Sequence, residues 1–228
     1  MQLRKAFVTV LAVFILAGGA LAPRCQATPL IGFTDNSPTG LASFLSNTFI
    51  KYGSWTQMVP SANTTIGAIV KSIGPGTGHA WLMDQVGSGT TAANMLAETD
   101  FSAPVISDEL NLSTAPYTTL FTGLSLTPGN YYLVLEGPAD FVFSPYQWLG
   151  DFTGVGVNTA SGFTVGPYGF TSAPAAFPPA SNFSSFPDFT TSFLFYRVEG
   201  TAVPAPGTLL LLGSGLVTMF SWRRKFQK

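Results

Sequence analysis

The sequence predicts an all-β protein, a single jelly-roll-like β-sandwich flanked by two apolar segments that lie outside the sandwich. Gly and Pro together supply 24 + 17 = 41 of the 228 residues, and they separate short runs rich in β-branched and aromatic side chains. The 20 Phe, 7 Tyr and 4 Trp can form a core, which argues against a disordered chain. A charged fraction of only 9% excludes a coiled coil.

The N-terminal segment has the pattern of a secretory signal peptide. The basic pair Arg4-Lys5 precedes an almost uninterrupted apolar run, Ala6–Ala17. Cys25–Ala27 then provides small residues at positions −3 and −1 of a cleavage site, which places the cut between Ala27 and Thr28. Residues 1–27 are therefore the predicted signal peptide, and an uncleaved membrane anchor is the alternative.

Residues 28–202 form the predicted exported domain, a length that suits one domain. This segment holds three basic residues and all 11 acidic ones, a formal charge of 3 − 11 = −8. Because such a domain repels phosphate backbones, we expect no nucleic-acid partner. The chain has a single Cys and a single His, so we also expect no disulfide framework and no His/Cys zinc site. We predict no metal site and no cofactor, although Asp and Glu side chains leave calcium binding as an open alternative.

The clearest local pattern in this domain predicts a hairpin. Thr118–Leu126 and Tyr131–Glu136 read as strands, and Thr127–Asn130 joins them. Pro128 and Gly129 suit the second and third positions of a type II turn. The second strand is apolar on both faces, so we expect it in the centre of a sheet.

The remaining elements are expected to be mostly short strands. These strands are Thr65–Val70, Ala80–Met83, Asp140–Phe143 and Thr191–Glu199. Ala92–Glu98 is the one short helix candidate. Tyr168–Asp188, dense in Pro and Phe, is expected to be a long loop whose aromatic side chains plug the sandwich edge; a surface aromatic patch is the alternative.

The search for catalytic groups predicts no catalytic residue, so we do not expect an enzyme. His79 follows a Gly-rich loop and is expected to be a solvated loop residue, since the chain has no Gly-x-Ser-x-Gly elbow. Paired carboxylates could serve glycoside hydrolysis, and Asp108 with Glu109, or Glu136 with Asp140, qualify by residue type alone.

The C-terminal segment predicts a transmembrane helix. Gly207–Trp222 is 16 uncharged residues, slightly shorter than the roughly 17–25 residues of a spanning helix. Trp222 suits the membrane interface, and the basic residues after it suit the cytoplasmic side. A buried core helix is the alternative.

Residues 203–228 resemble the sorting tail of PEP-CTERM proteins, with Ala205 in place of the Glu in the usual Pro-Glu-Pro motif. The resemblance has three parts: the motif Val203, Pro204, Ala205 and Pro206; the anchor residues Gly207, Leu209, Leu210, Leu211, Leu212, Gly213, Gly215, Leu216 and Trp222 within 207–222; and the basic stop Arg223, Arg224 and Lys225 within 223–228. It implies transient anchoring in the inner membrane of a Gram-negative bacterium and removal of the tail by an exosortase. The expected destination is the cell surface or extracellular matrix, in association with exopolysaccharide or biofilm.

We therefore expect a non-catalytic surface or matrix protein, with the exosortase, the inner membrane and extracellular polysaccharide as partners. The alternative is a carbohydrate-binding or adhesive module whose stacking platform is formed by Trp55, Trp81, Tyr146 and Trp148. A secreted hydrolase with a carboxylate pair is the least favoured hypothesis.

Overall fold

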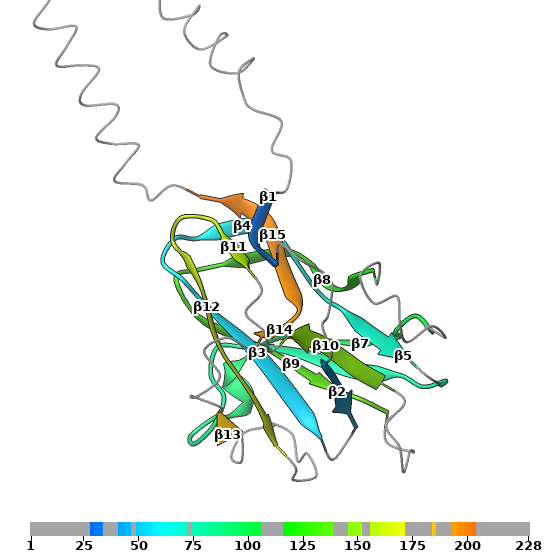
Figure 1. Cartoon of the computed structure of the whole chain (residues 1–228). Coiled ribbons are helices and arrows are strands. Elements are labelled where there is room, and N and C mark those ends of the chain that lie inside the picture. The colour runs from blue at the N-terminus through cyan, green and yellow to red at the C-terminus, as the bar shows by residue number, and fades with distance from the viewer. Residues whose placement is uncertain are drawn as a thin grey trace, which may run out of the picture.

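The computed structural model describes residues 28–33, 41–46, 49–72, 74–105, 116–138, 146–151, 156–171, 184–185 and 193–203. Over these residues the chain is almost entirely β-strand, which confirms the predicted all-β class (Figure 1). The described part contains one 3₁₀ turn, η1 (Ala92–Asn94), and no helix long and apolar enough to cross a membrane. The predicted signal peptide and the apolar segment 207–222 lie outside the described residues.

Within the described residues, the strands form two large sheets in a sandwich-like arrangement and one smaller sheet, and the named strands pair antiparallel with one another. The five-stranded sheet has the order β11 (Val157–Thr159), β1 (Thr28–Phe33), β15 (Tyr196–Ala202), β4 (Ser61–Ala68) and β8 (Thr118–Leu126). The six-stranded sheet has the order β13 (Ser184–Ser185), β12 (Phe163–Thr171), β3 (Ile50–Gln57), β9 (Gly129–Glu136), β6 (Gly78–Met83) and β7 (Met95–Phe101). In the smaller sheet β10 (Tyr146–Asp151) pairs with β14 (Phe193–Leu194), β2 (Leu41–Leu45) and β5 (Val70–Ser72).

The main core lies between the two large sheets. The inward residues of β9, Tyr131, Leu133 and Leu135, alternate along the strand as predicted and are buried there. Trp55 of β3 stacks on Tyr131, with ring centroids 5.5 Å apart and an angle of 21° between the planes. Tyr196 reaches across from β15 in the opposite sheet. Aromatic side chains of both sheets, together with aliphatic ones, thus fill the space between the two layers.

A second apolar cluster lies on the other face of the six-stranded sheet. It consists of Ile50, Tyr52, Trp81, Met83 and Val134, all buried. Since β9 lies between β3 and β6 and is buried on both faces, its predicted central position is confirmed.

The predicted hairpin between β8 and β9 is wrong. The two strands exist, but β8 pairs with β4 and β9 pairs with β3 and β6, so their connection passes from one sheet to the other. Gly129 does not take a positive φ; it opens β9 opposite Gln57. The Gln57 side-chain amide donates to the carbonyls of Leu126 and Thr127, which fixes the crossing. The turn residues predicted the reversal but not the partner of each strand.

Two further local predictions are wrong. In the segment predicted as a helix from Ala92 to Glu98, only η1 is helical, and the chain from Met95 onward is strand β7. His79 is not in a loop but in β6, opposite Asp100 of β7 and Glu136 of β9. Both corrections have the same cause, because pairing with a neighbouring strand overrides weak local propensity.

The other predicted strands are present with shifted bounds. Thr65–Val70 falls on β4 and β5, Ala80–Met83 on β6, and Thr191–Glu199 on β14 and β15. Asp140–Phe143 lies outside the described residues. Of the predicted loop 168–188, the first residues continue β12 to Thr171, and residues 184–185 form β13.

Candidate functional site

The beginning of β1 and the end of β15 lie side by side at one end of the five-stranded sheet (Figure 1). Thr28 lies opposite Gly200, and the Thr28 hydroxyl donates to the Gly200 carbonyl over 3.3 Å. One residue past β15, the Val203 amide donates to the Pro60 carbonyl over 2.8 Å. The predicted signal cleavage site and the predicted sorting motif therefore adjoin the same end of the domain.

We call this end the terminal pole; it comprises residues 28–30, 57–62, 126–130, 158–163 and 200–203. Hydrogen bonds join its segments: the Met58 amide donates to the Gly162 carbonyl over 2.7 Å, and the Ala160 amide donates to the Leu30 carbonyl over 2.9 Å. Gly162 takes a positive φ of 85°, which favours glycine at this tight reversal. The pole is therefore one connected surface, built from turns of both large sheets.

The terminal pole carries no charged side chain, although the domain as a whole is acidic. Two of its apolar side chains are exposed, Met58 with 74% of its surface accessible and Val203 with 39%. Thr28, Pro29 and Pro128 are exposed beside them. These segments thus form a neutral and partly apolar surface, bordered by Glu199, which lies opposite Pro29 and is paired with Arg197 over 3.4 Å.

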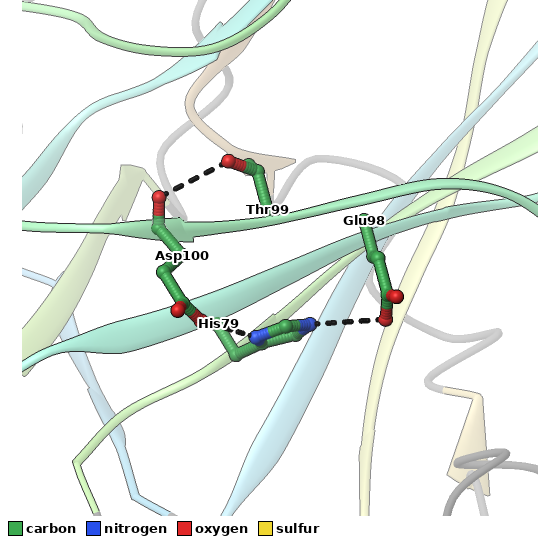
Figure 2. Close-up of polar contacts among 4 residues, drawn as sticks. All are labelled: His79, Glu98, Thr99 and Asp100. Carbon is green, nitrogen blue, oxygen red and sulfur yellow. Dashed lines mark hydrogen bonds and ion pairs between the residues drawn. The ribbon is translucent and has the colours of Figure 1, made fainter.

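A separate polar cluster surrounds His79 on the outer face of β6 and β7 (Figure 2). His79 Nδ1 lies 2.6 Å from Asp100 Oδ1, and His79 Nε2 lies 3.5 Å from Glu98 Oε2. The imidazole also packs on the Trp81 indole, with ring centroids 4.4 Å apart. Both ring nitrogens thus face carboxylates.

Glu136 lies opposite His79 on β9 and adds a third carboxylate to this face. Burial raises the pKa of Glu136, and the charge of His79 offsets part of that rise. A nucleophilic hydroxyl would have to take the place of one carboxylate on His79, because both nitrogens are already engaged. The cluster is therefore best described as a polar link between β6 and β7 at the edge of the sheet. Among the described residues, no group of three or more His, Cys, Asp or Glu side chains could hold a metal ion.

The four residues predicted as a sugar-stacking platform are buried. The exposed fractions are 1% for Trp55, 6% for Trp81, 1% for Tyr146 and 0% for Trp148. Trp55, Tyr146 and Trp148 belong to the main core, whereas Trp81 belongs to the outer-face cluster, so they do not form one surface. Because a sugar ring needs an accessible aromatic face, these residues do not support the platform hypothesis. Their role in the structure is packing.

The structure describes only some of the other predicted site residues. Of the suggested carboxylate pairs, Glu136 is described, whereas Asp108, Glu109 and Asp140 lie outside the described residues. Thr28 and Val203 are described, whereas Ala27 and the tail from Pro204 onward are not. The sequence did not reveal that β15 continues to Ala202 and leads directly into the motif. The pairing of Ala202 with Ser61 extends the strand beyond its predicted end at Glu199.

The tail sequence matches a known family model over residues 202–225, described as the PEP-CTERM protein-sorting motif. The chain carries a PEP-CTERM sorting motif. The match confirms the resemblance drawn from the sequence, and it begins at the last residue of β15. The motif indicates an exported, membrane-anchored sorting precursor. A search of the curated proteins found no match to the chain.

Proposed function

We propose that this protein is a non-catalytic component of the cell surface or extracellular matrix of a Gram-negative bacterium, associated with exopolysaccharide or biofilm. A jelly-roll-like domain of residues 28–202 is exported with the help of the signal peptide, and the sorting tail holds it in the inner membrane. An exosortase then removes the tail near Val203–Pro206. The observation that carries this proposal is the PEP-CTERM motif at residues 202–225.

Two features of the domain support the proposal. The motif follows β15 without a spacer, so cleavage within it would release a domain whose last strand is intact. The His79 imidazole is held between Asp100 and Glu98, which favours a structural rather than a catalytic role for this histidine.

The test is the mass of the C-terminal peptide in the native host, from the envelope and from the medium, with an exosortase-deficient strain as the control. We expect the surface form to end near Val203–Pro206 and the deficient strain to retain Lys228. Lys228 present in both strains would contradict exosortase processing and indicate a permanent anchor.

Residue 205 offers a matched variant for the same experiment. Ala205→Glu restores the usual Pro-Glu-Pro sequence of the family, so we expect the processed fraction to equal or exceed that of the natural chain. A variant with all three basic residues 223–225 changed to Gln removes the positive-inside signal and is expected to leave the tail unprocessed. If this variant is processed as well as the natural chain, the tail does not act as an oriented membrane segment.

A further inference from the structure

The terminal pole is separated from the predicted membrane segment by a very short stretch of chain. The Val203 amide is still hydrogen-bonded to Pro60, and the apolar segment begins at Gly207. Four peptide steps join these residues, so their Cα atoms are at most about 14 Å apart even when the chain is fully extended.

The dimensions of a bilayer show how close to the membrane this short connection would hold Val203. The hydrocarbon core is about 30 Å thick, and the polar layer on each side adds about 5–8 Å. As a helix, the 16 residues of 207–222 would span about 24 Å, less than that core. A short span draws its flanking residues toward the bilayer, so an inserted tail would hold Val203 within or just above the polar layer.

The surface chemistry of the pole fits this position. Anionic lipids repel a domain with a formal charge of −8, but none of that charge lies on the terminal pole. Two carboxylates border the pole: Glu199 lies opposite Pro29 and is paired with Arg197 over 3.4 Å, and exposed Asp84 follows Met83, which lies opposite Tyr132. Asp100 lies farther away, toward the other end of β6. The exposed Met58 side chain lies on the β3–β4 turn, whose Pro60 carbonyl binds Val203 directly.

We infer that, in the anchored precursor, the terminal pole rests on the lipid headgroup layer, with Met58 in contact with lipid. This inference rests on the proposed function, because it requires the tail to be inserted in the membrane. It assigns the neutral end of the sandwich as a lipid-facing surface and sets the domain upright on the membrane, with its strands leading away from it.

The test uses residues 28–228, the chain left after the predicted signal cleavage, which has no cysteine of its own, reconstituted in vesicles of zwitterionic and anionic phospholipids. A fluorophore is attached to Met58→Cys or, as a matched control, to Val105→Cys. Val105 is also an exposed apolar residue, at 70%, and it pairs with Ser72 beyond the far end of β7. The strand β9 alone spans about 27 Å between the two ends of the sheet. Headgroup-attached nitroxide lipids should quench the label at Met58 and leave the label at Val105 unchanged.

Flotation of the same vesicles distinguishes failure of the lipid-facing pole from failure of the membrane anchor. If the chain floats with the vesicles but the two labels are quenched equally or not at all, the lipid-facing pole is overturned while the anchored precursor stands. If the chain does not float, the tail is not a membrane anchor, and both proposals fail.

A spacer gives an independent check of the tether argument. Inserting about ten Gly and Ser residues after Val203 adds a root-mean-square reach of about 17 Å. We expect quenching at Met58 to fall while flotation is unchanged. Undiminished quenching would overturn the argument that the short connection positions the pole.

Discussion

Gly53 of β3 lies directly beneath the Tyr196 ring at the centre of the sandwich. A Cβ atom at position 53 would lie 2.9 Å from both Cδ1 and Cε1 of Tyr196. The ring cannot move aside freely, because it is 1% exposed and its hydroxyl donates to the Ser54 carbonyl over 2.6 Å. Burial also raises the pKa of Tyr196, so its phenol remains a hydrogen-bond donor. Gly53→Ala should therefore force the two sheets to adjust.

The expected cost follows from opposing effects. Overpacking in a filled core costs about 1–3 kcal/mol. Replacing glycine where φ is not positive returns about 0.4–1 kcal/mol by restricting the unfolded chain. The net loss in the free energy of unfolding should be about 1–2 kcal/mol. For a domain of this size, each kcal/mol corresponds to a decrease of about 2–4 °C in Tm.

The assay is urea unfolding followed by tryptophan fluorescence, applied to a double-mutant cycle. The variants are Gly53→Ala, Tyr196→Leu and their combination. Because leucine lacks the ring atoms that meet the new methyl group, Gly53→Ala should cost almost nothing in the Tyr196→Leu background. The coupling should be about 1 kcal/mol or more, within the range for residues in contact. Equal costs in both backgrounds would refute the close approach of Tyr196 to Gly53.

Three further predictions concern single side chains. Burial lowers the pKa of Lys51 to about 8, whereas the ordinary value for lysine is 10.5. Between these pH values the unfolded chain binds more protons than the folded protein, so the free energy of unfolding should rise with pH through this range. Lys51→Met should remove that gain, and an unchanged slope in pH-dependent unfolding would contradict it. His79→Gln should lower the free energy of unfolding by no more than about 1 kcal/mol, because its partners Glu98 and Asp100 are exposed; a larger loss in urea unfolding would mean that the cluster anchors β7. Trp148→Phe removes the 2.9 Å hydrogen bond from Nε1 to the Phe195 carbonyl and leaves a cavity, so Tm should fall by the equivalent of about 1–3 kcal/mol; an unchanged Tm in a thermal melt would exclude this contribution.

The sequence predicted strands where the structure has β4, β5, β6, β8, β9, β14 and β15, but it did not predict central strands such as β1 and β3, nor the partner of each strand. The segment of β9 is apolar on both of its faces, and this pattern predicted a central strand, because a strand covered on both sides carries apolar side chains on both. The connection from β8 to β9 was predicted to be a hairpin, because Pro and Gly favour a reversal of the chain. They favour it both in a hairpin and in a connection between two sheets. Whether the second strand returns to the first or crosses to another sheet depends on distant residues, here the Gln57 amide.

The same limit applies to the candidate site. The sorting tail was readable because its signal is local: a short motif, an apolar run and a basic end in order. The His79 cluster joins residues 79, 98, 100 and 136, which only strand pairing brings together. The tryptophans predicted as a platform were expected to be accessible, whereas they are buried. Trp148 is buried because β10 pairs with β14, β2 and β5 and contributes to the main core. These partners are distant in the sequence, so the residues around Trp148 do not show its burial.

The placement of β15 has a consequence for the route by which the protein leaves the cytoplasm. This last strand of the domain lies between β1 and β4 in the five-stranded sheet, and its contact with β1 joins residues 172 positions apart. The sheet therefore cannot close until the end of the domain is available, and such long-range pairing is slow to form. On the proposed export route, a chain that crosses the membrane unfolded and N-terminus first would complete this sheet only after β15 has emerged, just ahead of the tail. The end of folding would then coincide with the end of translocation.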